Sequence, residues 1–308
     1  MEIFNIFGSI FGYILWAAYY LVNNFGFAII IFTLIFKVVL FPSSVKQQKS
    51  MAANAKLQAK QKALQEKYAN DKQKYNEEVQ KMYEQENVKP FGGCLSSLLP
   101  MFVMLGIYYA VVRPLTNVLH ISKDAIAELT NYVNTIPGIS INTSGSLYYQ
   151  IDLLRIFNKI SDHSAVQEIL TGDEIEKIQS LSGGFNVFGI DLLSTPKVVG
   201  GWLLLIPILC LVTSVGSQIY TMFMKGNPMS NQQGCMKWMF IALPLFTAYI
   251  AYTVPAAVGF YWIWSTIFGF IQTLIMNKFY SPELVNAKAE AQHIARLELD
   301  EKNVTPNN

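Results

Sequence analysis

The sequence has few of the residues that build enzyme active sites and metal centres. Of its 308 residues, only three are histidine and three are cysteine, and charged residues make up 14%. The cysteines show no disulfide or metal-site spacing, and the histidines, at 120, 163 and 293, offer no ligand pair. GxxxxGK[ST], HExxH and GxSxG motifs are also missing. We therefore expect a protein that is not an enzyme, with no catalytic residue, metal or cofactor.

The first 24 residues contain no Lys or Arg, so they lack the basic region of a secretory signal. At helical spacing they place one polar and aromatic stripe on a single face. Its members are Asn5, Ser9, Gly12, Tyr13, Trp16 and Tyr20. This stripe favours an N-terminal helix over 1–24 that lies in the outer membrane interface, with a membrane span as the alternative. The spacing of Gly8 and Gly12 resembles a helix-packing motif.

Apolar residues are abundant: 52% of the chain is hydrophobic, and the mean hydropathy is +0.30. Five apolar segments are long enough to cross a hydrocarbon layer of about 30 Å. They cover residues 25–42, 94–111, 201–224, 238–254 and 257–277. The predicted fold is an all-α integral membrane protein with five transmembrane helices, an N-terminal interfacial helix and a cytoplasmic helical hairpin.

The charge distribution predicts the orientation of these spans. Residues 43–91 contain ten Lys and six acids, a net charge of +4, whereas 114–200 contains five basic and nine acidic residues, a net charge of −4. Because basic loops stay in the cytoplasm, 43–91 should lie inside and the long loop 112–200 outside. The loop 225–237 and the tail 278–308 are then cytoplasmic. The N-terminus is outside.

The basic segment 43–91 has helical spacing of Ala and Leu among Lys and Gln, and a polar break at Asn70-Asp71. It predicts two short antiparallel helices, which form a hairpin. Such a hairpin could be a solvated linker. It could also receive an incoming chain or touch anionic lipid at the inner surface.

Lys37 is the one charged residue in the apolar run from Gly26 to Pro42. A lysine in the centre of a membrane span costs about 3 kcal/mol on insertion scales. Its side chain either snorkels to an interface or lines a hydrated cavity. Lys37 lies five residues before Pro42, roughly 7.5 Å of helix rise, so its ammonium group can also reach the nearer membrane surface by snorkelling.

Polar side chains inside the predicted spans recur at helical spacing and form three rows. The rows are Thr33 and Lys37; Ser214, Gln218 and Thr221; and Tyr261, Ser265 and Gln272. One row alone is typical of a hydrogen-bonded seam between helices. Three rows together with an intramembrane lysine favour a shared hydrated recess.

The order of several motifs resembles the YidC family of membrane protein insertases, the bacterial branch of the Oxa/Alb superfamily. The run GFAIIIFTLIFKVVLFP is followed by the Lys-rich hairpin and by VKPFGGC. FNVFGIDL then precedes the third span, NPM lies in the second cytoplasmic loop, LPLF lies in the fourth span, and P-x4-FYW, which contains Trp262, opens the fifth. The resemblance covers roughly residues 20 to 280.

This resemblance implies a protein of the bacterial cell membrane that inserts and helps to fold membrane proteins through a hydrophilic, positively charged groove. Lys37 aligns with the basic residue of that groove, usually arginine, and keeps the charge without arginine's planar fork. The implied partners are nascent membrane proteins and the lipid bilayer, with the Sec translocon and the ribosome as further candidates. No DNA partner is expected.

Two other functions fit a lysine in a membrane cavity. A small-solute or ion transporter would also need one, although such transporters tend to show internal repeats, which this sequence lacks. A structural subunit of a membrane complex would use the polar rows as partner contacts.

Overall fold

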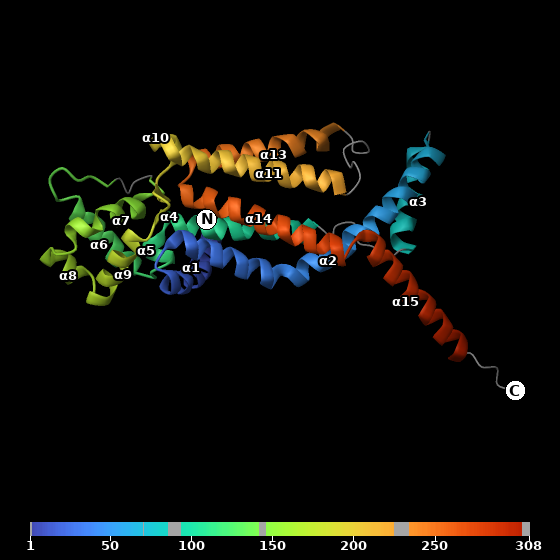
Figure 1. Cartoon of the computed structure of the whole chain (residues 1–308), viewed down its shortest axis with the longest axis horizontal. Coiled ribbons are helices and arrows are strands. Elements are labelled where there is room, and N and C mark those ends of the chain that lie inside the picture. Colours follow the sequence, from blue (N-terminus) through green and yellow to red (C-terminus); the bar gives the residue numbers. More distant parts are fainter. Residues whose placement is uncertain (1, 70, 86–93, 142–145, 225–233, 304–308) are drawn as a thin grey trace. The chain divides into compact units, whose positions relative to one another are not determined.

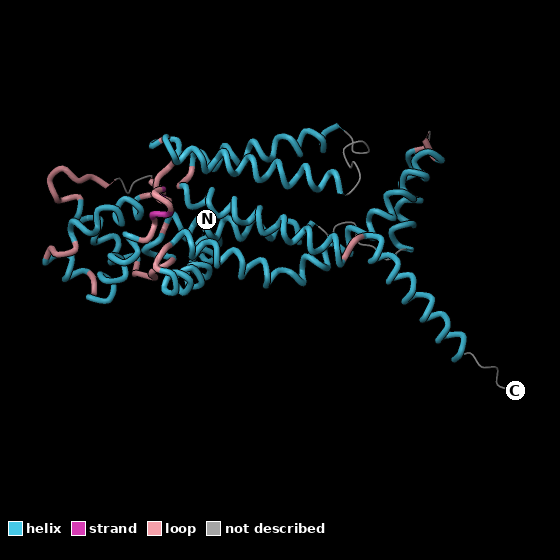
Figure 2. Tube along the Cα trace, viewed as in Figure 1, coloured by secondary structure: helices cyan, strands magenta, loops and turns pink. Residues whose placement is uncertain are grey.

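The computed structural model describes residues 2–69, 71–85, 94–141, 146–224 and 234–303. These residues form helices almost throughout, and the one strand pair among them has two residues in each strand (Figure 2). The all-α fold of an integral membrane protein is therefore confirmed. By contacts the chain divides into two compact units, Met1–Phe36 with Pro100–Phe270, and Lys37–Leu99 with Ile271–Asn308.

Four helices among the described residues have stretches long and apolar enough to cross a membrane. These stretches are Asn5–Val22, Phe25–Lys49, Gly201–Thr221 and Ala256–Phe279. They belong to helices α1 (Glu2–Val22), α2 (Phe25–Lys67), α11 (Leu205–Met224) and α14 (Ala256–Phe279). Shorter apolar stretches, Phe102–Val112 and Ala242–Thr253, lie in α4 (Cys94–Val112) and α13 (Gly234–Thr253). The N-terminal helix α1 thus has the length and composition of a membrane span. A span was the alternative to the interfacial helix that the sequence favoured.

In the first unit, a tight turn at Asn23-Asn24 joins α1 to α2. Asn23 has a left-handed φ of 50°, which Asn adopts more readily than most residues. The side chain of Asn24 accepts hydrogen bonds from the backbone N–H groups of Gly26 (3.0 Å) and Phe27 (3.2 Å), so it caps the start of α2. This asparagine pair therefore ends one helix and begins the next.

The polar stripe of α1 packs against the segment that follows α4. Asn117, in the short helix α5 (Pro114–Asn117), is fully buried and donates from Nδ2 to Oδ1 of Asn5 at 3.1 Å. The ring of His120 stacks on Tyr13 with ring centroids 3.5 Å apart, and its Nδ1 lies 3.3 Å from the hydroxyl of Ser9. Protein thus covers part of the predicted interfacial stripe, whereas the side chains of Tyr13 and Tyr20 stay exposed.

The predicted outer loop is a folded helical domain. Its helices are α5, α6 (Lys123–Val133), α7 (Tyr149–Ile160), α8 (Ser164–Ile169), α9 (Gly172–Gly183) and α10 (Pro196–Val199). Strands β1 (Asn186–Val187) and β2 (Ile190–Asp191) form its antiparallel hairpin, and the 3-10 helix η1 (Gly201–Leu204) leads into α11. Apolar side chains on the inner faces of these amphipathic helices, including Leu129, Leu154, Phe157 and Leu181, are at most 1% exposed. The segment therefore has a hydrophobic core of its own.

The last three spans of the first unit meet around α11. Helices α11 and α13 lie side by side (Figure 1). The thiol of Cys210 on α11 donates to the carbonyl of Gly259 on α14 at 3.2 Å, and the rings of Tyr220 and Phe270 meet edge to face at 4.9 Å. Gly259 has no side chain, which lets the two helices approach closely at this point.

Helix α2 passes from the first unit into the second at Lys37 and continues through Pro42 to Lys67, so Phe25–Lys67 is one 43-residue helix. This differs from the predicted pair of short helices, because the first helix of the hairpin is an extension of the span. A turn begins at Tyr68, and α3 (Lys72–Gln85) follows it in the chain. Gln61 donates to the hydroxyl of Tyr75 at 3.1 Å across the pair. The last described helix is α15 (Pro282–Asn303), whose described side chains are mostly exposed.

Candidate functional site

Lys37 lies at the edge of the buried face of α2. That face contains Phe25, Ile29 and Phe32, all fully buried, and Lys37 is about 120° around the helix from Phe25 at 3.6 residues per turn. Its side chain is half-buried. This position lets the aliphatic stem of the lysine cover apolar surface while the ammonium group points toward a more polar region.

Thr33, one turn before Lys37, is 1% exposed and donates from its hydroxyl to the carbonyl of Ile29 at 2.6 Å. Its donor is therefore satisfied within its own helix. The hydroxyl oxygen can still accept a hydrogen bond from a neighbouring group.

Pro42 adds polar backbone near Lys37. Proline has no N–H, so the carbonyl of Val38, four residues earlier, loses its helical donor. One turn further on, the hydroxyl of Ser44 donates to the carbonyl of Leu40 at 3.2 Å. The stretch of α2 after Lys37 is therefore more polar than its side chains alone suggest.

No carboxylate neutralises Lys37 among the residues that the structure describes. Ion pairs elsewhere join Lys81 to Glu78, Arg155 to Asp191, and Lys177 to Asp173. A half-buried cation without an acidic partner attracts anionic groups that approach it, and more strongly than an exposed cation would in bulk water.

The polar row of α11 lies beside the contact of this helix with α14. Ser214, Gln218 and Thr221 are half-buried, and Thr221 donates to the carbonyl of Ser217 at 2.8 Å. Ile206 of α11 lies against Gly259 of α14. Around the axis of α11, the three residues of the row are about 60–120° away from Ile206. These side chains therefore flank the interface between the helices and do not fill it.

The polar row of α14 lies on the other side of that helix. Tyr261 is 4% exposed and shares a side-chain hydrogen bond with Ser265. These two residues are about 200–240° around α14 from Gly259, so they face away from α11. Trp262 and Gln272 are half-buried. The structure therefore does not bring the α11 and α14 rows together across the α11–α14 interface.

The predicted residues divide between the two units. Seven of them belong to the first unit: Thr33, Ser214, Gln218, Thr221, Tyr261, Trp262 and Ser265. Lys37 and Gln272 belong to the second. The common recess stays a prediction from sequence.

Sequence reasoning missed the burial of Asn117. Its side chain also donates to the carbonyl of Tyr109 at 2.9 Å, so it joins α1, α4 and α5. The only signal was an asparagine in the otherwise largely apolar stretch PLTNVLHI.

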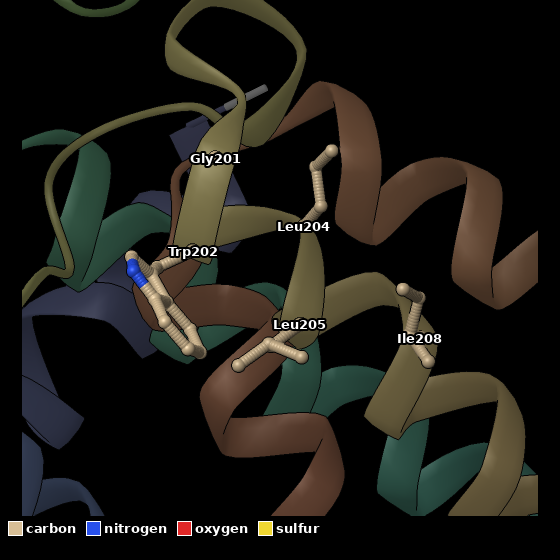
Figure 3. A pocket seen from close by; sticks show the side chains of 5 residues that line it. All are labelled: Gly201, Trp202, Leu204, Leu205 and Ile208. Carbon is tan, nitrogen blue, oxygen red and sulfur yellow. The ribbon is translucent and has the colours of Figure 1, made fainter.

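A hollow of about 400 Å³ lies at the start of α11, lined by Gly201, Trp202, Leu204, Leu205 and Ile208 (Figure 3). None of the predicted site residues lines it. Among the described residues no group of three His, Cys, Asp or Glu side chains could hold a metal ion.

Comparison with known proteins gives one family. The sequence profile of the family described as 60Kd inner membrane protein matches residues 17–283. The chain is also similar to proteins named membrane protein insertase YidC. It is 45% identical over 93 residues to that of Saccharophagus degradans, 42% over 90 residues to that of Geobacter sp. strain M21, and 40% over 90 residues to that of Fusobacterium nucleatum.

These similar segments are only parts of the proteins compared. They cover 30%, 29% and 29% of this chain, and 17%, 17% and 42% of the three relatives. The match of the family profile is much longer and includes α2, α4, α11, α13 and α14. The chain therefore belongs to the 60Kd inner membrane protein family, which is the YidC family.

Proposed function

We propose that this chain is a membrane protein insertase, which moves segments of nascent membrane proteins into the lipid bilayer. The family match over residues 17–283 is the observation that carries the proposal. The relatives' shared name, membrane protein insertase, describes the same activity. The half-buried cation in the first predicted span supports it, because such a residue is costly unless it has a role.

The proposed site is a hydrated groove that includes Lys37. In this groove, Lys37 attracts acidic residues of a substrate for a short time, and the polar rows on α2, α11 and α14 keep water within the membrane. A substrate's polar segment would otherwise cross hydrocarbon, where each unsatisfied polar group costs several kcal/mol. A groove of half the membrane depth shortens that path.

Hydrophobic transfer supplies the driving force. Once the polar segment has moved into the groove, the apolar segment of the substrate leaves along the spans and enters lipid, gaining about 25 cal/mol per Å² of apolar surface buried. The membrane potential acts in addition on translocated charge. The process requires no nucleotide hydrolysis by this chain.

We further propose that the hairpin of α2 and α3 receives the incoming chain on the cytoplasmic side. Its Lys-rich surface suits contact with acidic segments or anionic headgroups. The Sec translocon and the ribosome are proposed as further partners. The orientation, with the N-terminus outside and the C-terminus in the cytoplasm, is proposed from the charge distribution.

Reconstitution tests the proposal. The purified chain is placed in liposomes, a small single-span substrate is synthesised in their presence, and its protection from protease is measured. Insertion above the level of protein-free liposomes supports the insertase. No insertion, together with flux of a small solute or ion, would favour the transporter instead.

A further inference from the structure

The turn between β1 and β2 holds a phenylalanine in an unfavourable and exposed position. Val187 pairs with Ile190, so Phe188 and Gly189 are the two central residues of the hairpin. Their φ angles are 53° and 80°, both left-handed, which is the pattern of a type I′ turn. Asn, Asp and Gly favour these positions, whereas a bulky residue is uncommon there. Yet the Phe188 side chain is 84% exposed.

The neighbours of this turn place Phe188 at the end of a membrane span. Its ring meets that of Phe27 edge to face, with centroids 6.1 Å apart. Phe27 lies in the first turn of α2, within the apolar stretch that begins at Phe25, and is itself 42% exposed. Asn24 donates to the carbonyl of Asn186 at 2.9 Å, which ties the hairpin to the same helix end. Phe188 therefore lies at the level where α2 enters the membrane.

A second exposed apolar group lies just before and at the start of the apolar stretch that includes α11. Val198 is 81% exposed, Val199 58% and Trp202 77%, and they stand directly before or within the first residues of the apolar stretch Gly201–Thr221. Strand β2 contacts η1, so the hairpin and this group are connected. Tryptophan at the end of a span is typical of the membrane interface.

We propose that these side chains anchor the outer domain in the outer leaflet of the bilayer. We call Phe27, Phe188, Val198, Val199 and Trp202 the outer apolar rim. The rim continues the apolar surfaces of α2 and α11, which face lipid, so lipid is the partner that its position and chemistry fit. The exposed Lys197, next to Val198, can reach the phosphate groups above it.

Depth measurements with spin labels test this anchor. In a variant with Cys94, Cys210 and Cys235 replaced by Ala, single cysteines at Phe188 and at Val198 carry a nitroxide label. The protein is reconstituted at low density into phosphatidylcholine and phosphatidylglycerol vesicles. Power saturation then compares collisions with oxygen, which concentrates in lipid, and with a water-soluble nickel chelate. Leu34→Cys, in the span, and Glu168→Cys, on exposed α8, are the matched controls.

We expect the labels at 188 and 198 to show oxygen-to-nickel collision ratios several-fold above that at 168 and below that at 34. A ratio equal to that at 168 at both positions would overturn the proposal. So would spin–spin broadening that grows with protein density, because a second copy would then cover the rim. If the cysteine at 188 prevents folding, the Val198 label alone decides between these outcomes.

Discussion

The close packing of α1 on the segment after α4 can be tested at Gly12. A Cβ atom at this position would overlap the carbonyl oxygen of Asn117, lie 2.6 Å from its carbonyl carbon and 3.1 Å from the Cα of Val118. These are backbone atoms, so no side chain can turn aside to make room. The Gly12→Ala substitution therefore forces α1 as a whole to move.

The cost follows from two terms. Overpacking a tight contact typically costs about 1–3 kcal/mol. Moving α1 also weakens the hydrogen bond between Asn117 and Asn5, worth roughly 0.5–1.5 kcal/mol net. Alanine's preference for helix over glycine offsets up to about 1 kcal/mol of this, so we expect Gly12→Ala to lower the free energy of unfolding by about 1–4 kcal/mol.

The assay is denaturation of the purified protein in mild detergent, with helicity followed as SDS is added. Gly216→Ala is the matched control, since a Cβ atom at Gly216, also in a helix, meets nothing within 4 Å. This control should be neutral or stabilising, because alanine favours helix over glycine by up to about 1 kcal/mol. Equal midpoints for the two variants would refute the docking of α1 on Asn117.

Three further predictions concern orientation, the hairpin and pH. In a background without native cysteines, Glu168→Cys should react with an impermeant maleimide in intact cells and Ala63→Cys should not; the reverse pattern would contradict the orientation. Replacing residues 50–85 by a short flexible linker should leave the unfolding midpoint of the span bundle nearly unchanged but reduce insertion several-fold, whereas full insertion would leave the hairpin a solvated linker. Burial lowers the pKa of His120, so the unfolded chain binds more protons, and stability should fall as the pH drops below about 6.5. His120→Asn, which suits the left-handed backbone there, should remove this dependence, and an unchanged pH profile would contradict it.

The spans could be predicted because a run of about 20 consecutive apolar residues is long enough to cross the hydrocarbon layer as a helix. The apolar runs in α2, α11 and α14 gave this signal directly. The fold of the outer domain could not be predicted in the same way, since the charge count gives only the side of the membrane. Its helices are short and amphipathic, and their core contains residues such as Leu154 and Phe157 of α7, a helix that packs against α5 and α9.

At Pro42 the extent of the helix differs from the extent of the apolar run. The apolar run ends at Pro42, so the hairpin helices were expected to be separate from the span, yet α2 runs through Pro42 to Lys67. The spacing of the polar rows shows which residues share one face of a helix, but it does not show which neighbouring helix that face meets. On α14, the close approach at Gly259 determines which face meets α11 and so places Tyr261 and Ser265 on the opposite face.

The central claim is that the charge of Lys37 attracts acidic segments of a substrate, and paired substrates test it most directly. Two small single-span substrates differ only in whether their translocated segments contain Asp and Glu or the neutral Asn and Gln. Each is presented to the wild-type chain, Lys37→Ala and Lys37→Arg in liposomes, and the yield of protease-protected substrate is measured. Gel filtration and circular dichroism first show that each variant is folded.

An attraction of about 1 kcal/mol corresponds to roughly a fivefold change in yield. We expect Lys37→Ala to lower insertion of the acidic substrate about fivefold and to change the neutral one little, because hydrophobic partitioning still drives it. Lys37→Arg should keep insertion of both substrates, since it keeps the charge. An equal loss for both substrates with Lys37→Ala would contradict charge attraction and leave hydration of the groove, or snorkelling, as the role of Lys37.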